Sequence, residues 1–291
     1  MESEKPPCRL VAVDGNGTLL GADGTTISEY TRSVISKIEA KGIPVVLATG
    51  RPFEKARATL EKAGMSQYVL TENGARAVRI ADGTAVWETW LDGSEVAGVL
   101  HRIQEKMPSA CFAQLTAEGG LLEEKHPWLQ DEISKGPAEK IFRRKVPDVV
   151  QEIAKGYKCA KTYLHLPEAL DFAEAMKEVK ACVGDAWEVR EIKQLLPKMH
   201  NCCEVQSSRV NKADGLRELC QVAGIPLDQV WAFGDDLNDV RMLSEVGWGV
   251  RMANHLPALN GIGKDITDFS NEADGVARYL EKHLLKAAPG A

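Results

Sequence analysis

The chain has 291 residues, of which 44% are hydrophobic and 27% are charged, and its formal net charge is −6. This composition is ordinary for a globular protein with a full core, and the length predicts two domains. The acidic balance argues against a nucleic-acid partner, because such proteins carry a basic stripe. No apolar run is long enough to span a membrane, so we expect no membrane partner.

Seven cysteines are scattered along the chain without a Cys-x-x-Cys pair. An odd number at such spacings argues against both a disulfide framework and a zinc site. The first residues lack the apolar stretch of a signal peptide. We therefore expect a cytoplasmic protein, and nothing in the sequence indicates its oligomeric state.

The first third of the chain alternates predicted strands with predicted helices. Residues 9–14 form a short apolar run that stops at Asp14, which predicts a buried parallel strand ending at that acid. A helix is expected between Ser28 and Gly42, because Ser is a good N-cap and Gly a good helix stop. Further predicted elements are a strand over 43–48, a helix over about 53–63 and a strand over 68–71.

The last third of the chain shows the same alternation of helices and strands. A predicted helix is followed by a strand over 230–233 that leads directly into Gly-Asp-Asp. Alternating strands and helices predict an open parallel sheet with its ligands at the carboxyl ends of the strands. In the middle of the chain no candidate strand leads into a comparable polar motif. We therefore predict an α/β protein, with a Rossmann-like parallel-sheet core from residues 1–84 and 200–291 and an inserted α+β cap domain over 85–199.

Four short polar segments stand at predicted strand ends or helix starts, namely 14–20, 49–51, Lys212 and 234–239. Each segment alone is a weak signal, because short acidic or glycine-rich strings are common. Their order, spacing and placement together are a strong one.

These segments resemble the motifs of the haloacid dehalogenase superfamily, whose first motif is Asp-x-Asp-Gly-Thr. The closer resemblance is to the Cof-type subfamily of sugar-phosphate phosphatases, in which a large type IIB cap lies between the second and third motifs. Other segments that resemble this family are 71–75, 231–243, 249–254 and 271–276. The match covers about 9–85 and 200–285, while the middle of the chain matches mainly in position and length.

The resemblance implies a Mg²⁺-dependent phosphatase that hydrolyses a small phosphorylated metabolite, such as a sugar phosphate, through an aspartyl-phosphate on Asp14. It implies Mg²⁺ ligands from Asp14, the backbone carbonyl of Asn16 and Asp235, with Asp239 close by. So many carboxylates together would be costly without a cation. The catalytic residues that it implies are Asp14, Asn16, Thr49 and Lys212. The residues that would bind the substrate are Thr49, Gly50, Arg51, Asn73, Lys212 and Asn238.

Asn16 departs from the family pattern, because the phosphatases carry a second aspartate two residues after the nucleophile. That acid protonates the leaving oxygen and then activates water, and a carboxamide can do neither. The chain could be a variant made to slow turnover, an enzyme in which another group supplies the proton, or a catalytically silent protein that binds phosphorylated metabolites.

A phosphomutase, a phosphonatase or a dehalogenase on the same scaffold are further alternatives. A mutase also needs acid–base chemistry, and a dehalogenase gives no reason for the acidic pair of Asp235 and Asp239.

Overall fold

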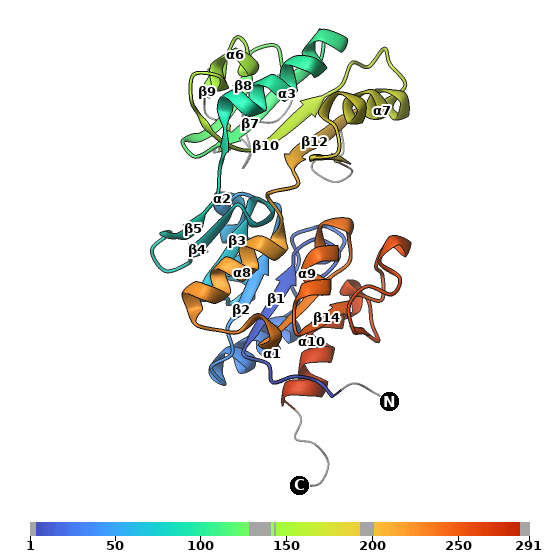
Figure 1. Ribbon diagram of the computed structural model, residues 1–291. Helices are drawn as coiled ribbons and strands as arrows, with labels where there is room; N and C mark the ends of the chain where they lie inside the picture. The colour runs from blue at the N-terminus through green and yellow to red at the C-terminus, as the bar shows by residue number, and fades with distance from the viewer. Residues whose placement is uncertain (1–3, 128–140, 143, 193–200, 286–291) are drawn as a thin grey trace. The chain divides into compact units, whose positions relative to one another are not determined.

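The computed structural model describes residues 4–127, 141–142, 144–192 and 201–285 (Figure 1). The chain divides into two compact units, Met1–Glu88 with Asn211–Ala291 and Thr89–Val210. None of the helices in the described parts is long and apolar enough to cross a membrane. The seven cysteines all lie in described parts of the chain, and all are free thiols.

The first unit is built on an eight-stranded sheet with the order β15-β14-β13-β1-β2-β3-β4-β5. The strands from β15 to β3 run parallel, and β4 and β5 extend the sheet as antiparallel neighbours. The predicted parallel-sheet core is therefore confirmed. The strands are β1 (Leu10–Asp14), β2 (Val45–Ala48), β3 (Tyr68–Thr71), β4 (Arg76–Arg79), β5 (Ala85–Glu88), β13 (Val230–Gly234), β14 (Trp248–Arg251) and β15 (Asp265–Ile266).

Helices cover both faces of this sheet, because its central strands are apolar on both sides (Figure 1). Val11 and Val13 of β1 pack in one core cluster with α1, α2 and α10, whereas Leu10 and Ala12 pack in another with α8 and α9. The helices are α1 (Glu29–Ala40), α2 (Phe53–Ala63), α8 (Lys212–Ala223), α9 (Val240–Glu245) and α10 (Gly275–Leu280). Single helical turns are η1 (Glu72–Gly74), η3 (Leu227–Gln229), η4 (Leu237–Asp239), η5 (Pro257–Leu259), η6 (Asn271–Ala273) and η7 (Glu281–Leu285).

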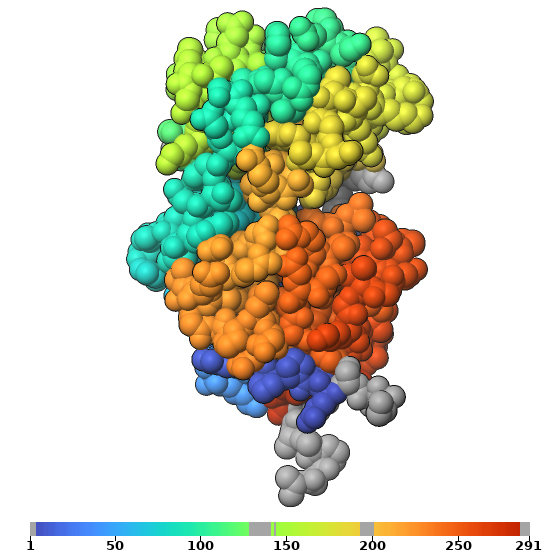
Figure 2. Space-filling model, in the orientation of Figure 1, coloured from blue at the N-terminus to red at the C-terminus, as the bar shows by residue number. Residues whose placement is uncertain are grey.

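Hydrogen bonds join the two chain segments of the first unit. Figure 2 shows the blue N-terminal segment lying directly against the orange C-terminal segment on the surface of this unit. The Arg9 backbone N–H donates to the Gln229 carbonyl at 2.8 Å, and the Trp231 indole N–H donates to the Pro6 carbonyl at 3.1 Å. The unit is therefore one folded body made from both ends of the chain.

The second unit has a sheet with the order β11-β12-β10-β7-β8-β9, and β6 pairs with β10. Its strand pairs are antiparallel except β8 with β9, so this unit is α+β as predicted. Its strands are β6 (Leu91–Asp92), β7 (Cys111–Thr116), β8 (Gly119–Glu123), β9 (Arg144–Val146), β10 (Lys158–His165), β11 (Trp187–Glu191) and β12 (Cys202–Ser207). Its helices are α3 (Gly93–Lys106), α6 (Val149–Ile153) and α7 (Phe172–Val183).

The boundaries between the units lie later in the chain than the sequence predicted. The first unit keeps residues 85–88 because β5 pairs with β4 at the edge of its sheet. The second unit keeps residues 200–210 because β12 pairs with both β10 and β11. The expected second core segment, 200–291, is corrected to Asn211–Ala291.

Candidate active site

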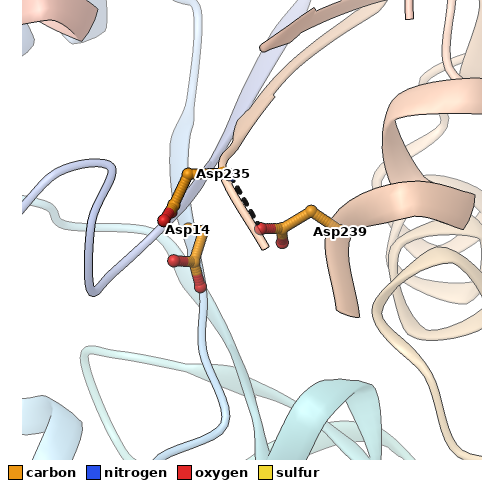
Figure 3. Close-up of side chains that lie close together, drawn as sticks. All are labelled: Asp14, Asp235 and Asp239. Carbon is orange, nitrogen blue, oxygen red and sulfur yellow. Dashed lines mark hydrogen bonds between the residues drawn. The ribbon is translucent and has the colours of Figure 1, made fainter. Parts of the chain in front are cut away.

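Three aspartates meet where β1 and β13 end. β1 ends at Asp14, and Asp235 directly follows β13, its parallel neighbour. Asp239 is the last residue of the turn η4, which follows Asp235 and Asp236 in the chain. One carboxylate oxygen from each residue lies within 4.8 Å of the others, and Figure 3 shows the three side chains together. The strand-end placement that the sequence predicted thus brings these acids into one cluster.

The chemistry of this cluster fits a divalent cation. Carboxylate oxygens are the ligands that Mg²⁺ prefers, and the cation would offset the repulsion between them. Asp235 accepts a hydrogen bond from the Thr18 hydroxyl at 2.6 Å. Asp239 is fully buried, and the backbone N–H groups of Asp235 and Asp236 donate to its Oδ2 at 3.0 and 3.1 Å. Asp14 and Asp235 are therefore better placed than Asp239 to offer oxygens to a metal.

Burial and mutual repulsion change the acidity of the cluster. Burial, followed by the charge of Asp14, raises the pKa of Asp235 from 3.8 to about 8. Burial also raises the pKa of Asp14 to about 6, although the charge of Lys212 opposes the shift. Without a cation, the folded site therefore holds protons at a pH at which ordinary carboxyl groups have lost them.

We expect the metal-free protein to lose stability as the pH rises through these values. Below the unfolded-state pKa near 3.8 the carboxyl of Asp235 is protonated in both states. Between there and about 8 only the folded state holds the proton, so the free energy of unfolding falls with rising pH. Mg²⁺ should raise the melting temperature more at pH 8 than at pH 5, both of which lie in this range. Asp235→Asn should flatten the metal-free profile and remove the Mg²⁺ effect, and an unchanged Mg²⁺ effect in that variant would contradict the assignment.

Lys212 connects Asp14 to Asp239. It is the first residue of α8, it is fully buried, and its ammonium donates to Asp14 Oδ1 and, at 2.7 Å, to Asp239 Oδ1. Burial alone would lower the pKa of Lys212, but the two carboxylates outweigh it and raise that pKa. Lys212 therefore stays charged beside the predicted nucleophile.

The turn η1 packs closely against the start of α8. Asn73 and Gly74 have φ angles of 57° and 93°, in the left-handed region. A Cβ atom at Gly74 would lie 2.3 Å from the carbonyl oxygen of Asn211, the N-cap residue of α8. Only glycine tolerates that approach, so η1 packs directly against the backbone of Asn211 and Lys212 at the start of α8.

Residues 49–51, which follow β2, lie beside the turn η1. Thr49 is buried, and its backbone N–H donates to the Leu70 carbonyl at 2.9 Å. A Cβ atom at Gly50 would lie 2.8 Å from Asn73 Oδ1, and that oxygen accepts a hydrogen bond from Asn238 Nδ2 at 3.1 Å. Gly50, Asn73 and Asn238 are therefore direct neighbours.

Arg51 is bound to Asn16. Its Nη2 donates to Asn16 Oδ1 at 2.5 Å and to the Gly24 carbonyl at 2.6 Å, while Nη1 donates to the Thr59 hydroxyl at 3.2 Å. Asn16 itself is exposed. The guanidinium thus holds the carboxamide in one orientation, a contact that the sequence did not reveal.

Thr18 and Asn254 have no role predicted from the sequence, although both stand in segments that resemble the family. Thr18 donates to Asp235, and Asn254 Nδ2 donates to the Gly17 carbonyl at 2.8 Å. The only available signal was their position in those segments, because spacing does not reveal a hydrogen bond between distant loops.

The chain matches a family model and several known proteins. The family model for haloacid dehalogenase-like hydrolase matches residues 11–280. The chain is 25% identical over 287 residues to 5-amino-6-(5-phospho-D-ribitylamino)uracil phosphatase YcsE of Bacillus subtilis (strain 168), covering 98% of this chain and 99% of the relative. It is 28% identical to the HMP-PP phosphatase of Cronobacter sakazakii (strain ATCC BAA-894), covering 86% of each.

Solved structures show the same fold. A protein from Thermotoga maritima superposes with a TM-score of 0.75 at 21% identity, covering 97% of this chain and 98% of that one. A sugar phosphatase of HAD subclass IIB superposes with a TM-score of 0.74 at 18% identity, covering 94% and 98%. Because the family model matches residues 11–280, which include parts of both units, the chain belongs to the haloacid dehalogenase-like hydrolases.

Proposed function

We propose that the chain is a phosphatase that hydrolyses a small phosphate monoester, of the sugar-phosphate kind, through an aspartyl-phosphate on Asp14. The observation that carries the proposal is the contact of Asp14 with the buried Lys212 beside two further aspartates. A carboxylate held next to a fixed ammonium can approach a phosphoryl group that would otherwise repel it.

In the first step an oxygen of Asp14 forms a bond to phosphorus, and the bond from phosphorus to the leaving oxygen breaks. Lys212 and the Thr49 hydroxyl would hold the oxygens of the transferring group, with Gly50, Asn73 and Asn238 shaping the space beside them. Mg²⁺, held by Asp14, the carbonyl of Asn16 and Asp235, would neutralise charge on the phosphoryl oxygens. Arg51 would act through its contact with Asn16.

In the second step water attacks the phosphorus of the aspartyl-phosphate and releases phosphate from Asp14. Asn16 cannot take a proton from that water or give one to the leaving oxygen, because a carboxamide acts neither as an acid nor as a base near neutral pH. We therefore propose that both steps are slow in this chain.

We propose that Thr89–Val210 acts as the cap domain that selects the substrate, because it is an insertion between motif-bearing segments. The phosphatases named above act on small phosphorylated metabolites, which supports a small-molecule substrate. We also propose a cytoplasmic location, since seven free thiols suit a reducing compartment.

A catalytically silent protein that binds phosphorylated metabolites is the second candidate, and Asn16 is the observation that favours it. In that case Lys212, Thr49 and the acidic cluster would bind phosphate and metal without turnover.

Phosphate release from a panel of sugar phosphates and an activated aryl phosphate separates the two candidates. We expect slow release with Mg²⁺ and none with EDTA, and Asp235→Asn should behave like the EDTA-treated protein. Release that is unaffected by EDTA would contradict the metal assignment. No release from any substrate, together with Mg²⁺-dependent binding of the same ligands, would establish the silent protein instead.

A further inference from the structure

We propose that Asn254, supported by Asn271, is a positioning residue that holds the loop 14–20 against Asp235 and so sets the affinity of the site for a divalent cation. Asn254 lies in the loop after β14. Its Nδ2 donates to the Gly17 carbonyl at 2.8 Å, and its Oδ1 accepts from the Asn271 backbone N–H at 3.1 Å. The carboxamide of Asn254 thus joins the loop 14–20 to Asn271 in the C-terminal segment of the chain.

Asn271 makes a second attachment to the same loop. It is the first residue of η6, and its Nδ2 donates to the Leu20 carbonyl at 2.7 Å. Asn254 and Asn271 therefore hold the loop 14–20 through two of its carbonyl groups. The two asparagines are also hydrogen-bonded to each other.

The strand end that carries Asp235 is attached to the same C-terminal loop as Asn254. The Leu256 backbone N–H donates to the Asp235 carbonyl at 2.9 Å, and the Met252 N–H donates to the Gly234 carbonyl at 3.0 Å. Asn254 lies between these two attachment points in the sequence. It therefore connects the backbone at Asp235 to the loop on the other side of the cluster.

The loop and Asp235 are already in tight contact, so small movements of the loop change the site. Gly17 has a φ of 74°, and a Cβ atom there would lie 2.2 Å from Asp235 Oδ2. The Thr18 hydroxyl donates to the other oxygen, Oδ1, at 2.6 Å. A shift of Gly17 would therefore turn the carboxylate of Asp235 relative to Asp14.

A cation site of this kind is sensitive to such a shift. Mg²⁺ demands near-ideal octahedral geometry. Loss of a group that orients a ligand typically weakens metal binding by about 10–100-fold. Because Asn254 is exposed, its hydrogen bonds contribute little to folding stability, so its loss should affect metal binding far more than the fold.

The test measures Mn²⁺ binding to the full chain without substrate by electron paramagnetic resonance. Mg²⁺ is then added as a competitor for the same site. We expect Asn254→Ala to bind Mn²⁺ about 10–100-fold more weakly than the parent chain. Asn254→Asp keeps the acceptor for Asn271 but loses the donor to Gly17, and should also bind more weakly. Asn260→Ala is the matched control, because Asn260 lies in the same loop and contacts His255 instead. It should bind like the parent.

Kinetics and stability provide independent readouts. In Asn254→Ala the Mg²⁺ concentration for half-maximal phosphate release should rise, because the site would bind the cation more weakly. The melting temperature of the metal-free protein should not change. This combination separates a positioning role from a general loss of folding.

Two results would overturn the inference. If Asn254→Ala binds Mn²⁺ as tightly as the parent, the asparagine does not position the site. If Asn254→Asp binds more tightly than the parent, added negative charge matters and loop geometry does not. The inference rests on the proposed function, because it presumes a cation at Asp14 and Asp235. A parent chain that binds no Mn²⁺ would therefore overturn the proposed metal site itself, a result distinct from the other two.

Discussion

Asn16→Asp should raise the turnover of an alkyl phosphate by about 10²–10⁴-fold at saturating Mg²⁺, the usual gain from a positioned general acid and base. The two side chains have the same shape, and Arg51 donates to the Asn16 oxygen that an aspartate would retain. The new carboxyl group should therefore occupy the same position, where it could protonate the leaving oxygen and then activate water. Steady-state phosphate release measures the effect.

The gain should depend on the leaving group. A phenolate leaves more easily than an alkoxide, since the pKa of a phenol is only about 10, so an aryl phosphate should gain less than an alkyl phosphate. Asn16→Ala is the control and should gain nothing on either substrate. Equal turnover in the parent and in Asn16→Asp would show that residue 16 is not the acid–base position.

Asp14→Asn should abolish turnover, with a loss on the order of 10⁴-fold or more, as expected when a nucleophile is removed. The loss is best measured in a chain that also carries Asn16→Asp, because the parent is expected to be slow. Lys212 would keep its contact with Asp239 in this variant, so the buried ammonium remains paired. Binding of phosphorylated ligands should therefore survive.

A matched control for Asp14→Asn is Asp228→Asn, since Asp228 is an exposed aspartate of the same unit that lies in η3, outside the acidic cluster. It should leave turnover unchanged. Residual turnover in Asp14→Asn close to that of its parent would exclude Asp14 as the nucleophile and require a mechanism with direct attack by water.

The acidic centre was predictable because it follows a local rule. A buried apolar run that stops at an acid places that acid at the carboxyl end of a parallel strand, and such ends meet at one edge of the sheet. Asp14 and Asp235 obey this rule, and the structure brings their oxygens together with that of Asp239. Lys212 was predicted from its motif alone, and the structure adds its two carboxylate partners.

The contacts between loops were not predictable, because they join residues far apart in the sequence. Arg51 holds Asn16, and Asn254 holds Gly17, through hydrogen bonds that no local pattern encodes. The boundary near residue 200 was placed too early for a similar reason. β12 belongs to the second unit only through its pairing with strands elsewhere in that unit, which the sequence of β12 alone does not specify.

The role of Asp14 as the nucleophile can be measured through the aspartyl-phosphate that it would form. The parent chain would be mixed with an activated aryl phosphate and Mg²⁺, quenched in acid, digested, and mapped by mass spectrometry. We expect one phosphoryl group on the peptide that contains Asp14. The label should be absent with EDTA and more abundant in the parent than in Asn16→Asp, because the parent lacks the base that speeds its hydrolysis. Phosphate release without label at Asp14, or label on another residue, would rule out Asp14 as the nucleophile.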